Sequence, residues 1–142
     1  MRDADIRAFL TELYETGQQN DAQEQERSKK MLNLEPETAQ FLNILIRSSR
    51  RTRLLEIGTS NGYITIWLAW AASLRGGRVI SIDLDADKRA MADANLRRVE
   101  LRKGVDLRCG DATEIVAGLP GFDRVILSVG KGLSMAYRSD EG

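Results

Sequence analysis

The fold is decided by the stretch Leu54-Leu55-Glu56-Ile57-Gly58-Thr59-Ser60-Asn61-Gly62-Tyr63, which predicts a strand, a glycine turn and the start of a helix. Neither glycine carries a Cβ, so the backbone there can turn tightly and approach a ligand. The N–H groups at the start of the helix suit a carboxylate or another anionic group. The stretch predicts a nucleotide-type cofactor pocket, with a plain strand–helix turn as the alternative for this feature alone.

Strand and helix patterns alternate from residue 53 onward. Strands are predicted over Arg53–Ile57, Arg78–Asp83, Val105–Cys109 and 122–129, with helices between them over Tyr63–Ser73, 86–101 and Ala112–Ala117. Strands that alternate with helices favour right-handed crossover connections and a parallel sheet. The chain is therefore predicted to be an α/β protein.

Three segments with helical signals precede the first strand. The first covers residues 6–14 and is expected to end or bend at Gly17, with a fresh helix start at Asp21. The segment up to Lys30 is polar on all sides, which predicts a surface helix or a lid. The last of these helices is expected to begin at Pro36 and to carry an apolar stripe, consisting of Phe41, Leu42, Leu45 and Ile46.

Composition excludes several classes of enzyme. The 142 residues fit one domain, and the equal numbers of basic and acidic residues, 21 each, do not indicate nucleic acid as a partner. The chain has no His, which excludes Ser-His-Asp and Cys-His mechanisms, and the single Cys109 excludes an internal disulfide. A signal-peptide pattern is absent and the longest apolar run, 64–74, is too short for a bilayer, so we expect a cytoplasmic protein with no membrane partner.

Two further loops place polar groups at the edge of the sheet where ligands bind in open parallel sheets. Asp83 ends the second strand about 20 residues beyond the glycines, where a carboxylate can accept from both hydroxyls of a ribose. We interpret the following Asp85 and Asp87 as helix-start acids. The third loop is Gly110-Asp111-Ala112, where a carboxylate can accept from an adenine amino group, although Asp111 also suits a helix cap.

Other conspicuous residues favour structural interpretations. The basic connector 47–53 is interpreted as a solvated loop and not as a phosphate site, because the chain has no net charge. Trp67 and Trp70, three residues apart on one helix, favour core or subunit contacts. Cys109 ends a predicted buried strand and is interpreted as an inert small hydrophobe.

Together these stretches resemble the class I S-adenosylmethionine-dependent methyltransferases, and within them the cation-dependent O-methyltransferases of the catechol and caffeoyl-CoA type. The resemblance runs from about Tyr14 to Leu127, and the glycine loop with Tyr63 is its most specific part. It is carried by residues 31–45, 54–69, 77–83, Asn95-Leu96, 110–113 and 122–127. The resemblance implies a Rossmann-like sheet in the order 3-2-1-4, here truncated after the fourth strand.

The resemblance also implies roles for individual residues. It places Glu56 and Gly58 on the methionine side of the cofactor, Asp83 on the ribose hydroxyls and Met31 near the methyl-donor end. The remaining implied cofactor-binding residues form the glycine loop and the adenine border: Thr59, Ser60, Gly62, Tyr63, Gly110, Asp111 and Ala112.

The sequence departs from the family pattern at two positions. Ile64 stands where the family commonly has a Ser that binds the methionine carboxylate, and Ser128 stands where it has a metal-binding Asp. A divalent cation is expected of the family, but its ligands are missing from this chain, so we predict no metal-binding residue. Lys131 is retained and is the candidate general base, with a solvated tail lysine as the favoured alternative.

Two functions compete. The first is an S-adenosylmethionine-dependent O-methyltransferase acting on a small hydroxylated acceptor, either catechol-like or a CoA ester. The alternative is a non-catalytic, truncated methyltransferase-fold module; glycine spacing disfavours a nicotinamide dinucleotide binder. We expect N-terminal helices or a lid over 1–50, a cofactor-binding core over 51–130 and a polar tail over 131–142. The fourth strand would then lack a neighbour, which predicts a homodimer.

Overall fold

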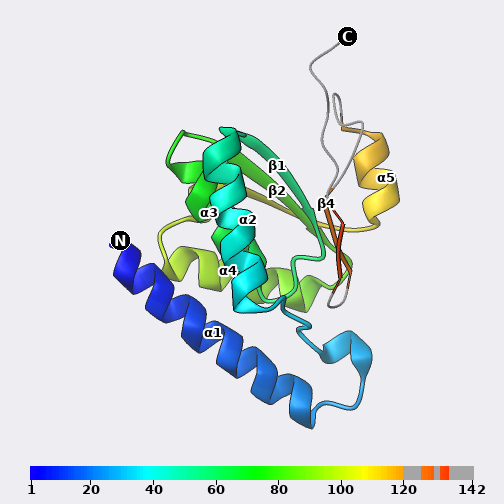
Figure 1. The fold of residues 1–142 in the computed structure, drawn as a ribbon. Helices are drawn as coiled ribbons and strands as arrows, with labels where there is room; N and C mark the ends of the chain where they lie inside the picture. The colour runs from blue at the N-terminus through cyan, green and yellow to red at the C-terminus, as the bar shows by residue number, and fades with distance from the viewer. Residues whose placement is uncertain (120–125, 130–131, 135–142) are drawn as a thin grey trace.

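The computed structural model describes residues 1–119, 126–129 and 132–134, and these form an α/β protein (Figure 1). The predicted bounds of five elements match the structure: β1 (Arg53–Ile57), α3 (Tyr63–Ser73), β2 (Arg78–Asp83), β3 (Val105–Cys109) and α5 (Ala112–Ala117). The other elements are α1 (Asp3–Gln23), η1 (Arg27–Lys29), α2 (Pro36–Ser49), α4 (Ala86–Arg98), η2 (Arg102–Gly104), β4 (Ile126–Val129) and β5 (Gly132–Ser134).

The sheet has the strand order β3-β2-β1-β4-β5. Strands β1 to β4 pair in parallel, which confirms the predicted order 3-2-1-4. The fifth strand was not predicted: β5 pairs antiparallel with β4, with Val129 opposite Gly132. The polar tail therefore contains a strand, and β4 has a neighbour on both sides. The pattern of a three-residue strand is too short to detect in sequence.

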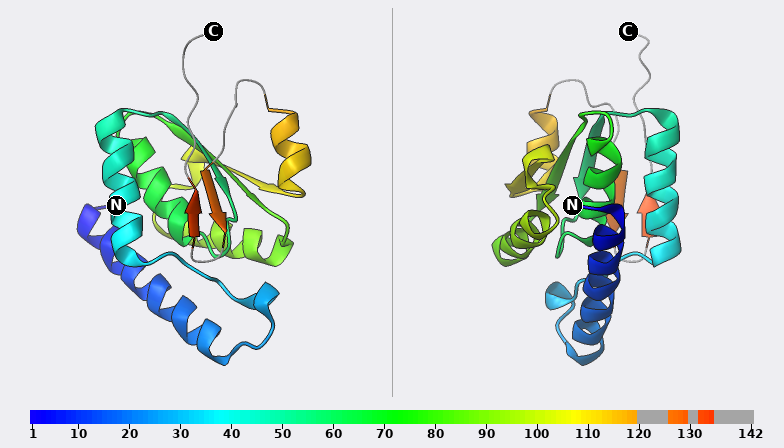
Figure 2. Two further views of the ribbon diagram at one scale, coloured as in Figure 1. Left: turned by 45° about the vertical axis from the view of Figure 1, so that its right-hand side comes forward. Right: turned by 90° about the vertical axis from the view of Figure 1, so that its left-hand side faces the viewer.

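The hydrophobic core lies between the sheet and the helices α2, α3 and α4 (Figure 2). Helix α3 is apolar on nearly every side, and it is buried because β1 and β2 cover one side and α2 the other. Trp67 and Trp70 are buried in this layer, as predicted. Asn43 of α2 donates a hydrogen bond of 2.8 Å from Nδ2 to the carbonyl of Trp67, which ties the two helices together.

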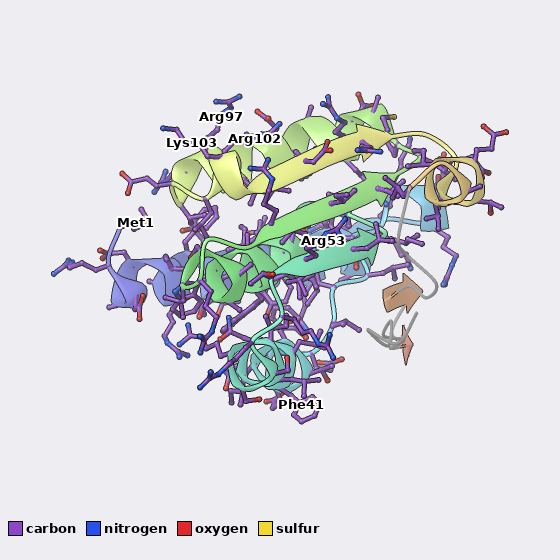
Figure 3. All side chains as sticks on the ribbon, turned by 90° about the horizontal axis from the view of Figure 1, so that it is seen from above. Met1, Phe41, Arg53, Arg97, Arg102 and Lys103 are labelled. Carbon is purple, nitrogen blue, oxygen red and sulfur yellow. The ribbon has the colours of Figure 1, made fainter. Side chains whose placement is uncertain are left out.

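Helix α2 and the basic connector correct two expectations. Phe41 points away from the sheet (Figure 3) and is 57% exposed, whereas Leu42 and Ile46 are buried, so the apolar stripe is narrower than predicted. Helix α2 continues to Ser49, and Arg50 ends it with a left-handed φ of 58°. Arg47 is half-buried, with its guanidinium 5.0 Å from the centre of the Trp70 ring, and is not part of a solvated loop.

Helix α1 runs uninterrupted through Gly17, where the sequence predicted an end or a bend. A Cβ added at Gly17 would lie 2.7 Å from Nδ2 of Asn33. The glycine is therefore explained by close packing and not by a change of helix direction.

None of the helices in the described part of the chain combines the length and the apolar character that a membrane span requires.

Gly62 is the point where α3 begins, and its replacement tests how closely α3 and α4 pack. Gly62 has a φ of 88°, and an added Cβ would lie 3.0 Å from Cα of Ala92 in α4. Gly76 has a φ of 64° but no atom within 4 Å of an added Cβ, which makes it a matched control.

We expect Gly76→Ala to lower the free energy of unfolding by about 1 kcal/mol, because only the backbone conformation is strained. Gly62→Ala is expected to cost about 2–4 kcal/mol, because the methyl group also meets a backbone atom that cannot move aside. Urea unfolding followed by circular dichroism measures both values, and equal losses would show that the close approach of α4 has no energetic weight.

Candidate cofactor site

A cavity of about 140 Å³ lies between the glycine loop, Asp83 and the segment that joins η1 to α2. In Figure 1 this light-blue segment passes below the sheet, beyond the carboxyl ends of the strands. The cavity brings together four of the predicted cofactor-binding residues, namely Gly58, Thr59, Ser60 and Asp83. Met31 and Ile64 also line it, so part of the cavity wall is apolar.

The glycine loop continues the hydrogen bonds of the sheet. The N–H of Gly58 donates to the carbonyl of Ile82 at 2.8 Å, and Gly58 has a φ of 95° that favours glycine. Nδ2 of Asn95 in α4 holds the carbonyl of Asn61 at 2.8 Å. The loop is thus fixed by β2 on one side and by α4 on the other.

Asp83 is fixed at the end of β2 by two backbone donors. Its Oδ2 accepts from the N–H of Ser60 at 2.8 Å, and its Oδ1 accepts from the N–H of Asp85 at 2.9 Å. Each carboxylate oxygen has a further lone pair for a ligand hydroxyl. Asp85 caps α4 by accepting from the N–H groups of Asp87 and Lys88, as predicted.

Glu56 lies beneath the loop and is almost completely buried. Its Oε1 accepts from the hydroxyl of Thr65 and from that of Ser81, the latter at 2.6 Å. Because Ser81 has a single hydroxyl proton and gives it to Glu56, Thr59 is the donor in its 2.6 Å contact with Ser81. These three hydroxyls fix one oxygen of Glu56, while Oε2 has no hydrogen-bond partner among the described residues.

Burial dominates the protonation of Glu56. It raises the pKa of the carboxyl from 4.5 to about 7, against the opposing effect of the hydroxyl donors Ser81 and Thr65, and the charge of Asp83 raises it further. A cation that approached Oε2 would favour the charged form, and this carboxyl therefore suits a positively charged group of a ligand.

Several predicted site residues do not line this cavity, and the buried Glu56 beneath the loop is one of them. Gly62 and Tyr63 form the start of α3, and Tyr63 is buried. Gly110 has a φ of 153°, and its N–H donates to the carbonyl of Asp83 at 2.9 Å. Asp111 caps α5, accepting from the N–H of Glu114, and Ala112 follows it. Lys131 lies outside the described residues.

Cys109 is exposed, which corrects the expectation of a buried residue. It is the last residue of β3, which is an edge strand of the sheet, and the burial of β3 fades toward this end. A pattern that indicates a strand does not reveal whether its last residue reaches beyond the core.

Sequence reasoning missed most of the cavity roof. Besides Met31, the roof contains Lys30, Leu32, Asn33 and Leu34, and Lys88 of α4 also lines the cavity. Lys88 donates from Nζ to the carbonyl of Lys30 at 2.8 Å. This roof has no helical or strand period, and its apolar residues, of which Leu34 is buried, are the only sequence signal that could have indicated a packed segment.

A divalent cation does not fit the residues that the structure describes. Across residues 1–119, 126–129 and 132–134, no group of three or more His, Cys, Asp or Glu side chains could hold a metal ion. The third residue of β4 is Ser128, and a neutral hydroxyl is a weak ligand for such an ion.

Four parallel strands in this order, with a cavity between a glycine loop and an acidic residue at their carboxyl edge, are typical of Rossmann-like proteins that bind nucleotide-type cofactors. The family model described as "O-methyltransferase" matches residues 3–137. The chain is 31% identical over 105 residues to the catechol O-methyltransferase of Niastella koreensis, covering 70% of this chain and 47% of that protein. It is 34% identical over 99 residues to that of Mycobacterium tuberculosis, covering 68% and 44%.

Solved structures agree with these relatives. The O-methyltransferase TomG from Streptomyces achromogenes, in complex with S-adenosylmethionine, has a TM-score of 0.63 and 30% identity, covering 69% of this chain and 46% of that one. The O-methyltransferase from Bacillus cereus, in complex with S-adenosylhomocysteine, has a TM-score of 0.66 and 27% identity, covering 90% and 55%. This chain belongs to the O-methyltransferase family, and it spans about half the length of the curated relatives it matches.

Replacement of Glu56 tests its raised pKa. Between pH about 4.5 and about 7 the folded state keeps a proton that the unfolded state releases, so stability falls as pH rises through this window. The total change amounts to up to about 3 kcal/mol, and it levels off above pH 7.

We expect Glu56→Gln to remove this component, so that its free energy of unfolding varies less between pH 5 and pH 7 than that of the wild type. Urea unfolding at several pH values measures the difference. Glu12→Gln, which changes an exposed residue of α1, is the control and should keep the wild-type slope. An unchanged slope in Glu56→Gln would contradict the assignment.

Proposed function

We propose that this chain binds S-adenosylmethionine in the cavity and forms the cofactor-binding part of an O-methyltransferase that acts on a small hydroxylated acceptor. The observation that carries the proposal is the pair of carboxylates beside the glycine loop. Asp83 suits ribose hydroxyls, and the unpartnered Oε2 of Glu56 suits the ammonium group of the methionine moiety. The family membership and the cofactors bound to TomG and the Bacillus cereus protein support it.

The roles of the residues follow from their chemistry. When bound, the cofactor supplies a methyl group activated by the adjacent sulfonium. Asp83 would orient the ribose, and Glu56 would neutralise the ammonium group while its Oε1 stays fixed by Thr65 and Ser81. Ile64 provides an apolar wall, and the backbone N–H groups of Ile64 and Thr65 in the first turn of α3 are candidates for binding the carboxylate. Gly110, Asp111 and Ala112 would border the adenine.

The acceptor hydroxyl must lose its proton during methyl transfer, and Lys131 is our candidate for the base. The acceptor class, catechol-like or a CoA ester, is proposed from the catechol O-methyltransferase relatives and from the sequence resemblance. The non-catalytic alternative is not favoured by the family match. Methyl transfer to catechol, measured with this chain and with Lys131→Ala, distinguishes an active protein from a binding module.

Calorimetric titration tests the cofactor site. We expect S-adenosylmethionine and S-adenosylhomocysteine to bind, and NAD to produce no heat of binding. Asp83→Asn is expected to weaken binding at least about tenfold, because the amide can no longer accept at both positions. Asp87→Asn removes an exposed acid of the same region and should bind as the wild type does. Absence of heat with both sulfur compounds would refute the proposal.

We also propose that the chain forms a homodimer. The earlier reason, a β4 strand without a neighbour, is corrected by β5, but β5 is itself the last strand of the sheet in the described part of the chain. An edge strand offers backbone N–H and C=O groups to a second copy. Sedimentation equilibrium should give twice the mass of the chain, and a single monomeric species at high concentration would rule the dimer out.

A further inference from the structure

The cavity roof is a strap, residues 30–34, whose backbone is hydrogen-bonded to its surroundings. The Oγ of Ser60 donates to the carbonyl of Met31 at 2.8 Å, and the Nζ of Lys88 donates to the carbonyl of Lys30. These two bonds link the strap to the glycine loop and to α4. They occupy carbonyl groups only, so the N–H groups of the strap need other partners.

Asp21, in the last turn of α1, supplies those partners. Its Oδ1 accepts from the N–H of Met31 at 2.7 Å, and its Oδ2 accepts from the N–H of Leu32 at 2.8 Å. Asn20 donates from Nδ2 to Oδ1 of Asp21 at 3.0 Å and to the carbonyl of Lys29 at 3.1 Å. One carboxylate therefore binds two consecutive N–H groups and is itself held in place by its neighbour.

The strap needs such support because Leu32 has a φ of 51°. The left-handed conformation is unfavourable for a residue with a Cβ, so the strap would relax if nothing held it. Partial burial raises the pKa of Asp21, but the N–H donors of Met31 and Leu32 outweigh it and hold that pKa below its ordinary value. The carboxylate is therefore charged, and its bonds to the strap are charge-assisted.

Gly17 brings α1 close enough for this contact. It lies one helical turn before Asp21, and its missing Cβ makes room for Asn33 of the strap. The same face of α1 therefore contacts the strap at two positions: Gly17 leaves room for it, and the charged Asp21 binds it. We propose that Asp21 is a positioning residue for cofactor binding, which holds the strap in its strained conformation over the cavity.

Two measurements on three variants test this inference, whose ligand readout rests on the proposed function. Asp21→Asn keeps the size of the side chain but loses an acceptor and the charge. Asp21→Glu keeps the charge but displaces the carboxylate by one methylene. Glu15→Gln, an exposed position of the same helix, is the control. The measurements are the Kd for S-adenosylhomocysteine and amide hydrogen exchange of Met31 and Leu32 without ligand.

We expect Asp21→Asn and Asp21→Glu to raise the Kd by about tenfold, which is the effect of one lost hydrogen bond to a charged group. In both, the amides of Met31 and Leu32 should exchange at least about tenfold faster, while those of β1 and α3 keep their wild-type rates. If Asp21 only stabilised the fold as a whole, its substitution would speed amide exchange throughout the protein. Glu15→Gln should leave the Kd and the exchange rates unchanged.

Each remaining outcome decides the question. Wild-type exchange rates at Met31 and Leu32 in either Asp21 variant would overturn the inference, and so would an unchanged Kd where the wild type binds. If the wild type does not bind S-adenosylhomocysteine, the proposed function fails, whereas exchange at the strap still reports whether Asp21 holds it. If Asp21→Asn does not fold, the same two measurements on Asp21→Glu decide.

Discussion

The parallel pairing of β1 with β2 is the constraint on which the rest of the site depends. Its register places Glu56 opposite Ser81, so a buried carboxyl meets a hydroxyl within the sheet. The pairing continues past the end of β1, where Gly58 donates to Ile82, and this bond fixes where the glycine loop begins. This register also places the side chain of Asp83 beside Ser60. If β2 were shifted by one residue relative to β1, every side chain of β2 would point to the opposite face of the sheet.

The central elements could be predicted from sequence because local and long-range signals agree there. The strand pattern of β1, the glycines after it and the apolar helix α3 all indicate the same strand–turn–helix unit, and the predicted bounds of β1 and α3 match the structure. The predictions for Gly17 and Cys109 failed because each depends on a distant contact or on the edge of the sheet. Gly17 resembles a helix breaker until Asn33 is placed against it, and Cys109 resembles a core residue until β3 is seen as an edge.

The residues of the candidate site fall into the same two groups: those that local patterns could predict and those that depend on long-range contacts. Gly58 and Ser60 lie in the loop after β1 and Asp83 ends β2, so parallel strands bring them to one edge whatever the details of packing. The strap could not be predicted, because its position depends on backbone bonds to Asp21, Ser60 and Lys88, which are far apart in sequence. Sequence reasoning therefore found the floor of the cavity and missed its roof.

Gly17 also shows what α1 gives up for its position. Alanine in the middle of a helix is more favourable than glycine by roughly 0.5–1 kcal/mol, so Gly17→Ala is a substitution that a routine stabilisation design would choose. Here the added methyl group would push on Asn33 and lift the strap. Helix α1 is therefore less stable with Gly17 than it would be with alanine, and this difference in free energy is the cost of packing closely against the strap. Any effort to make this protein more heat-resistant should therefore leave that glycine in place.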